Sequence, residues 1–299
     1  MKKDFQAFIQ DVIKELKTKL GNSYTIYCRL LRKHNGTSSQ MIIISDNAHN
    51  ASPCYSMEKY YELYQKPEDA GTIAADILKI YHQENIQDFQ LEWIHRKDKM
   101  LELVMFRIVS TDRNAGLLAD VPHHDLPGLN LSMLFYILVD TGNREHASIL
   151  LWNRHEKTWG LTEADLLEHA WKNTILTMGY TINNINDISG EPASTARCQE
   201  AEIPLYVITN TLKLYGAGCI LYPDVLKEAA QKLDSDFYIL PSSVHETIAV
   251  PAAGFKKSEA EVLKKMVMKI NQYELRCEEM LSDNVYYYSR KQQELSLGV

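Results

Sequence analysis

The segment that best combines catalytic side-chain types is 240–246, Leu-Pro-Ser-Ser-Val-His-Glu. It places two hydroxyls, an imidazole and a carboxylate within five positions. In extended backbone, residues two apart share a face, so Ser243 and His245 could approach as nucleophile and base. An acidic group would then orient the imidazole ring. Ser243, His245 and Glu246 are therefore the candidate catalytic residues.

A structural interpretation competes with catalysis. An activated serine usually sits on a sharp turn beside backbone donors, and the sequence contains no Gly-x-Ser-x-Gly motif. Pro241 and the serines can instead form a turn whose hydroxyls satisfy backbone groups, while His245 and Glu246 pair at the end of a strand. The sequence favours this second interpretation.

The adjacent residues His123, His124 and Asp125 offer three metal ligands, and His245 with Glu246 would complete a set of histidines and carboxylates. However, adjacent histidines normally point in different directions, whereas the helical zinc signature sets two of them four residues apart. A proline-bounded, exposed loop is the favoured interpretation of 122–127. We predict neither a metal site nor a cofactor.

The segment 215–219, Tyr-Gly-Ala-Gly-Cys, does not match a phosphate-binding loop. It lacks the third glycine and the following helix of a dinucleotide motif. Its apolar continuation predicts a strand over 217–221, with glycines that allow close backbone approach. Cys219 has apolar neighbours and is predicted to be a buried structural thiol.

The elements that must position these residues follow from periodicity. Apolar residues at helical spacing predict helices over 4–20, 57–64, 68–82, 162–178, 224–233 and from about 258, where Ser258 and Glu261 form a capping-box pair. The last of these helices carries Val262, Leu263, Met266, Val267 and Ile270 on one side. Runs of β-forming residues predict strands over 24–33, 40–45, 101–109, 131–139, 147–152, 205–209, 237–240, 247–250 and 285–288. Asn35 and Gly36 favour the positive φ of a tight hairpin turn between the first two strands.

The irregular alternation of these elements predicts an α+β fold with mixed or antiparallel sheets flanked by helices. The best division into sub-domains lies at 140–147, giving an N-terminal part over 1–143 and a C-terminal part over 147–299. Strand pairing across that point would make them one continuous domain.

Composition narrows the class of protein. The net charge is −7 and the pI is about 5.8, which disfavours nucleic-acid binding because phosphate contacts need clustered Lys and Arg. The longest apolar run, 131–139, is roughly half the ~20 residues of a membrane span. The five cysteines form no close pairs, and no apolar segment follows Lys2 and Lys3. We expect a cytoplasmic protein that binds no membrane.

The 17 tyrosines are an excess, gathered at 55–64 and 286–288. Tyrosine suits interfaces because it buries area and keeps a polar tip. Tyr60, Tyr61 and Tyr64 share a helical face, so a half-buried core position is favoured over an interface.

Several segments together resemble a known family. They are 206–210, Tyr-Val-Ile-Thr-Asn; 215–217, Tyr-Gly-Ala; 221–226, Leu-Tyr-Pro-Asp-Val-Leu; and 236–246, which ends in Pro-Ser-Ser-Val-His-Glu. This pattern is similar to an uncharacterised bacterial family, a domain of unknown function, over roughly residues 5–290. The resemblance implies no activity, cofactor or catalytic residue. Asn210, Tyr215 and Ser242 lie in these segments and are our candidate binding residues.

Two hypotheses follow. The first is a protein-binding or regulatory module with a protein partner or self-association, because strong catalytic motifs are missing and tyrosine-rich segments could form an interface. The alternative is a small hydrolase that uses Ser243 and His245, or a metal held by His123, Asp125, His245 and Glu246.

Overall fold

The computed structural model describes residues 4–46, 48–49, 52–64, 69–83, 96–140, 146–189, 203–253 and 260–298. The chain divides into two compact units. Unit 1 comprises residues 1–33, 37–92 and 141–145, and unit 2 comprises residues 34–36, 93–140 and 146–299.

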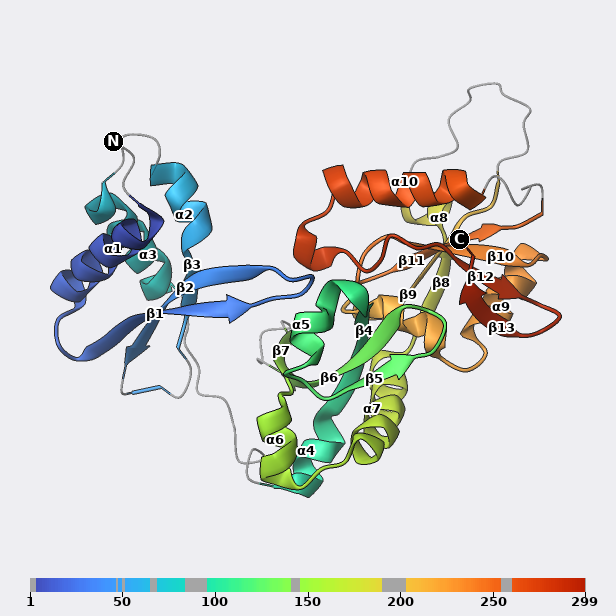
Figure 1. The fold of residues 1–299 in the computed structure, drawn as a ribbon, viewed down its shortest axis with the longest axis horizontal. Coiled ribbons are helices and arrows are strands. Elements are labelled where there is room, and N and C mark those ends of the chain that lie inside the picture. Colours follow the sequence, from blue (N-terminus) through green and yellow to red (C-terminus); the bar gives the residue numbers. More distant parts are fainter. Residues whose placement is uncertain are drawn as a thin grey trace. The chain divides into compact units, whose positions relative to one another are not determined.

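Unit 1 is a small antiparallel sheet covered by helices. Strands β1 (Tyr24–Arg32), β2 (Ser38–Asp46) and β3 (Cys54–Ser56) lie in that order, and the helices are α1 (Phe5–Leu20), α2 (Met57–Tyr64) and α3 (Ala70–Gln83). Figure 1 shows α1 beside α3. The buried positions of α1 follow helical spacing, and Gly21 ends the helix with φ 76°. The core of unit 1 includes Phe8, Ile9, Val12, Leu16, Ile42, Ile44, Ile73 and Ile77.

The hairpin between β1 and β2 confirms the predicted antiparallel pairing, with Arg32 opposite Ser38. Both turn residues have the positive φ that the Asn-Gly pair predicts, 57° at Asn35 and 69° at Gly36. The three tip residues 34–36 belong to unit 2 although both strands belong to unit 1.

The described residues of unit 2 form two antiparallel sheets. In the first, β6 (Leu131–Asp140) pairs with β4 (Val104–Ser110) on one edge and with β5 (His123–Leu126) and β7 (His146–Leu150) along the other. The second has the order β13-β12-β10-β11-β9-β8. Its strands are β8 (Thr181–Asn184), β9 (Tyr206–Thr209), β10 (Phe237–Pro241), β11 (Thr247–Pro251), β12 (Tyr286–Ser289) and β13 (Glu294–Leu297).

One large core joins the two sheets. Phe106 and Phe135 of the first sheet share it with Ile208, Phe237 and Tyr286 of the second. Helix α7 (Glu163–Met178) packs against β4, as Figure 1 shows. The connecting helices are α4 (Lys97–Leu103), η2 (Asp112–Asn114), α5 (Ala115–Leu118), α6 (Asn153–Trp159), α7 (Glu163–Met178), α8 (Ile185–Ser189), η3 (Gly216–Leu221), α9 (Val225–Leu233), α10 (Ala260–Tyr273) and η5 (Cys277–Glu279).

The start of α7 illustrates how local sequence sets these elements. The Thr162 hydroxyl accepts the backbone N–H of Asp165 at 3.1 Å, and the Asp165 carboxylate accepts the backbone N–H of Thr162 at 3.0 Å. This reciprocal pair satisfies N–H groups that the first helical turn leaves free. Thr162 is therefore the N-cap of α7, which agrees with the helix predicted over 162–178. The predicted capping pair at Ser258 lies outside the described residues.

Predictions of local structure were wrong at 217–221, at 101–103 and at the predicted loop 122–127, which contains β5. The segment 217–221 is part of the 3₁₀ helix η3, and Tyr215 directly before this helix has a φ of 56°. Residues 101–103 end α4, and the strand begins only at Val104. On α10, Leu263 and Val267 are buried and Val262, Met266 and Ile270 are exposed, so only part of the apolar side predicted for this helix is covered. A buried apolar run does not by itself distinguish helix from strand.

The α+β class is confirmed, and the strands of the described residues pair antiparallel in every sheet. The predicted division at 140–147 falls between β6 and β7, where Val139 lies opposite Ala147. Tyr55 lies in the core of unit 1, and Tyr60 and Tyr61 are partly buried against it. Within the described ranges, no helix is both long enough and apolar enough to cross a bilayer.

Candidate functional site

The four-stranded sheet buries a cation on the face turned away from the large core. Phe106 of β4 faces that core, so Met105 and Arg107 face the other side. Tyr136 lies opposite Met105 and shares this face. Arg107 is 6% exposed and Tyr136 is 1% exposed. A charged group and a phenol therefore lie together in a largely apolar environment.

Tyr215 covers the guanidinium group. The Arg107 Cζ atom lies 4.5 Å from the Tyr215 ring centroid and 5.9 Å from that of Tyr136. The two tyrosine rings meet edge to face at 5.2 Å. The Tyr215 hydroxyl is 3.2 Å from the hydroxyl of Ser148, an exposed residue. Tyr215 thus spans the distance between the buried cation and the surface.

A clamped loop holds Tyr215 in its left-handed conformation. The Asn210 amide donates to the Leu214 carbonyl at 2.7 Å and accepts the Leu214 N–H at 3.1 Å. A β-carbon on Gly216 would lie 2.2 Å from Thr209 Oγ1 and 2.5 Å from the His245 carbonyl oxygen. Only glycine fits at that position, which explains the Tyr-Gly pair seen in the sequence.

His245 is anchored to the same loop. Its Nδ1 atom accepts the backbone N–H of Tyr215 at 3.1 Å, and its ring stacks on the Tyr215 ring at 5.6 Å and 12°. Burial lowers the pKa of His245, although Glu279 and Glu246 act in the opposite direction. A neutral ring with its proton on Nε2 fits these contacts.

The Arg107 guanidinium has the Tyr215 phenol as a hydrogen-bond partner, but among the described residues it lacks the carboxylate that a buried cation usually has. Among the described residues no carboxylate forms an ion pair with it, and its Nε atom has no hydrogen-bond acceptor. The buried Tyr136 hydroxyl also has no partner there. Burial lowers the pKa of Arg107, while the phenols of Tyr215 and Tyr136 act to raise it. The site therefore holds unused hydrogen-bonding capacity beside an uncompensated charge.

His34, from the hairpin tip, also responds to this charge. Burial, reinforced by the positive charge of Arg107, lowers the pKa of His34 to about 3. Because His34 and His245 are both neutral near pH 7, Arg107 supplies the positive charge of this site.

The structure places the candidate catalytic residues in a tight turn between β10 and β11. The Ser243 hydroxyl accepts the backbone N–H of His245 at 3.0 Å. The Ser242 hydroxyl donates to the Glu246 carboxylate at 3.2 Å, and both serine N–H groups point to the Glu246 carbonyl. The turn therefore uses the hydrogen bonds of Ser242, Ser243 and Glu246 internally. The Arg107 site instead brings together Asn210, Tyr215 and His245.

The candidate metal ligands have other partners. His123 and His124 lie on β5, where the sequence indicated a loop. His124 contacts Glu163 at 2.8 Å, and the Asp125 carboxylate accepts the Ser132 hydroxyl at 2.7 Å. Within the described ranges, no three His, Cys, Asp or Glu side chains gather as metal ligands would.

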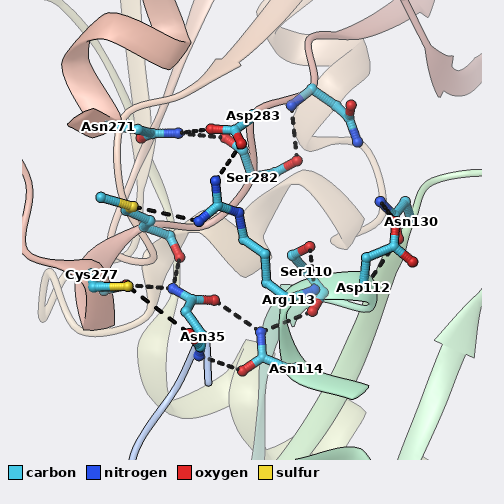
Figure 2. A network of polar contacts seen from close by, with 12 residues as sticks. Asn35, Ser110, Asp112, Arg113, Asn114, Asn130, Asn271, Cys277, Ser282 and Asp283 are labelled. Atoms are coloured by element: carbon cyan, nitrogen blue, oxygen red, sulfur yellow. Dashed lines mark hydrogen bonds and ion pairs between the residues drawn. The ribbon is translucent and has the colours of Figure 1, made fainter. Parts of the chain in front are cut away.

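A second polar cluster in unit 2 is occupied by internal hydrogen bonds (Figure 2). The Asn35 N–H donates to Asn114 Oδ1 at 2.8 Å, and the Asn35 amide donates to the carbonyls of Cys277 and Met280. Asn114 donates back to Asn35 Oδ1 at 3.0 Å. These contacts fix the hairpin tip against η2 and η5.

The same cluster extends to an ion pair between Arg113 and Asp283. The Asn271 amide also donates to Asp283 at 2.7 Å. Burial alone would raise the pKa of Asp283, but the hydrogen bonds from Asn271 and Arg113 lower it overall. In contrast to Arg107, this arginine is matched by a carboxylate, so its role is structural.

Sequence reasoning missed Arg107 and Tyr136. The available signal was the composition of β4, in which Arg107 is the one charged residue among seven buried positions. A charge inside a fully buried strand is rare unless it is paired or functional.

Fold and site together define an α+β protein with a buried cationic centre. The chain belongs to Family of unknown function (DUF5688), whose family model matches residues 5–290. The predicted family membership is thereby confirmed. Searches of curated proteins and of solved structures gave no match.

Proposed function

We propose that the protein is a binding or regulatory module that recognises an anionic group of its partner through Arg107. One observation carries this proposal: a guanidinium that is more than nine-tenths buried lacks a carboxylate partner among the described residues. A buried unpaired charge is costly to fold around. That cost is understandable if the complementary charge arrives with a ligand.

The surroundings of Arg107 support binding rather than reaction. Tyr136 adds a buried hydroxyl without a partner, and Tyr215 adds an aromatic surface next to the cation. These groups can orient and hold an anion. The partner is a small molecule, another protein or a second copy of the chain.

The hydrolase alternative gains less support. A serine nucleophile needs its hydroxyl hydrogen-bonded to the imidazole that takes its proton. Here the Ser243 hydroxyl accepts from the His245 backbone, and the ring Nδ1 accepts from Tyr215. A Ser243→Ala variant should therefore leave any activity of the purified protein unchanged, and a complete loss would restore this alternative.

Native mass spectrometry of protein purified from its own host tests the proposal. We expect a retained small molecule, protein partner or second subunit that is lost in Arg107→Met. Arg154→Met is the matched control, because Arg154 also lies over an aromatic ring, at 5.3 Å from Trp152, but is exposed. A wild-type protein that retains nothing, or retention that does not depend on Arg107, would contradict the proposal.

A further inference from the structure

The charge of the Arg107 site limits the class of ligand. Arg107 contributes one positive charge, while His34 and His245 are neutral near pH 7 because burial lowers the pKa of each. A single negative charge balances such a site. A phosphate dianion would bring an uncompensated second charge into a buried environment. Charge balance thus favours a monoanion.

The hydrogen-bonding groups favour a carboxylate. A guanidinium presents parallel N–H donors whose spacing matches the two oxygens of a carboxylate. The Tyr136 hydroxyl has no partner among the described residues and can donate to the same anion. Both groups stand on the same face of neighbouring strands, so the sheet itself fixes their separation.

The side chains next to Arg107 and Tyr136 favour an apolar body behind the carboxylate. Met105, Tyr136 and Met178 form a small buried cluster, with Leu138 and Tyr215 packed against it. Methionine side chains adapt to ligands of different shape. The Tyr215 ring also offers a flat aromatic surface beside the cation.

We propose that Arg107 and Tyr136 form a receptor for one carboxylate group attached to an apolar body. The inference rests on the binding function proposed above, and it specifies the ligand of that site. Two sources share this chemistry: a free organic acid and a carboxylate of a peptide or protein.

Isothermal titration calorimetry on the full chain tests the ligand class. The probes are benzoate, its neutral analogue benzamide, and inorganic phosphate. We expect benzoate to bind at least tenfold more tightly than either of the others. Two further probes, a short peptide ending in a free Phe carboxylate and its amidated form, distinguish the sources. Tighter binding of the free-acid peptide than of benzoate would assign a peptide carboxylate, and the reverse order a free organic acid.

Variants tie the binding to this site. Arg107→Met and Arg107→Lys should each weaken benzoate binding at least tenfold, the second because an ammonium lacks the planar fork. Tyr136→Phe should weaken it about fivefold, as expected for one lost hydrogen bond. The exposed control Arg154→Met should bind benzoate as the wild type does, and circular dichroism should show that every variant is folded.

The outcomes separate the two proposals. Phosphate that binds as tightly as benzoate, with the same loss in Arg107→Met, would overturn the carboxylate inference and leave the binding function standing. Benzoate binding that is equal in wild type and Arg107→Met would overturn this site as the receptor. The native mass spectrum then decides separately whether the protein is a binding module.

Discussion

Replacing Arg107 by Met should make the protein without its ligand more stable. Methionine has a similar length and an apolar side chain, so it can occupy the space beside Met105 and Tyr136 without an unpaired charge. Even buried ion pairs, which keep their mutual attraction, can be replaced by apolar residues with a gain of about 1–4 kcal/mol. Arg107 has no such pair among the described residues. Its removal therefore forfeits no ion-pair energy.

The lost contacts with Tyr215 and Tyr136 reduce this gain. A cation over an aromatic ring stabilises by roughly 0.5–2 kcal/mol, more when it is desolvated. The net expectation is a gain of about 1–2 kcal/mol in the free energy of unfolding. For a folding unit of roughly 150–250 residues, each kcal/mol raises Tm by about 2–4 °C. Arg107→Met should accordingly melt about 2–8 °C above the wild type.

Tryptophan fluorescence during urea or thermal unfolding measures this change selectively. Trp152, Trp159 and Trp171 lie in unit 2, so their emission follows the unit that contains Arg107. Arg107→Lys keeps the charge and should give no gain. Arg154→Met should change the unfolding free energy by less than about 0.5 kcal/mol, as for most exposed positions. A loss of more than about 1 kcal/mol in Arg107→Met would refute the reasoning, because it would mean that the folded protein already compensates this cation.

Three further predictions follow from other contacts. Gly216→Ala should destabilise unit 2 by about 3 kcal/mol or more, because the new β-carbon would meet backbone atoms at 2.5 and 2.6 Å. Thermal melting measures this loss. The control Gly116→Ala, whose β-carbon meets nothing within 4 Å, should be neutral or slightly stabilising. Asn35→Ala should cost about 2–3 kcal/mol in urea titrations, because the Asn35 side chain donates to the carbonyls of Cys277 and Met280 and accepts from the Asn114 amide, and a loss as small as that of the control Asn153→Ala would contradict this. Acidification from pH 7 to pH 5 should destabilise the wild type by about 2 kcal/mol more than it destabilises His34→Gln. The reason is that His34 takes up a proton below about pH 6.5 in the unfolded chain, but only near pH 3 in the folded protein, where its pKa is about 3. Equal pH dependence of the two proteins would show that His34 is not buried as described.

Local patterns determined much of the fold. Helix α1, the β1–β2 hairpin and the cap of α7 each follow from signals within a few residues, namely helical spacing, an Asn-Gly turn and a Thr-x-x-Asp cap. The segment 217–221 was mispredicted because its apolar run suits either a strand or a buried helix. Its actual form depends on the packing of Gly218 against Phe106, which is more than a hundred positions away in the chain.

The candidate site was only half visible in the sequence. Asn210, Tyr215 and His245 stand in distinctive segments, and the structure joins them through the Asn210 clamp and the stacking on Tyr215. Arg107 could not be associated with them, because that association arises from strand register and from the fold of η3. A serine near a histidine was detectable, but the direction of each hydrogen bond was not.

The hairpin tip has a consequence for the order of folding. Asn35 bonds to carbonyls 242 and 245 positions further along the chain, so unit 2 closes a loop that spans most of the polypeptide. During synthesis, residues 34–36 must wait until Met280 has left the ribosome before these bonds can form. Contacts of such long sequence separation form slowly. Completion of unit 2 is therefore a late event, and a nascent chain that stalls before residue 277 carries a hairpin whose acceptors do not yet exist.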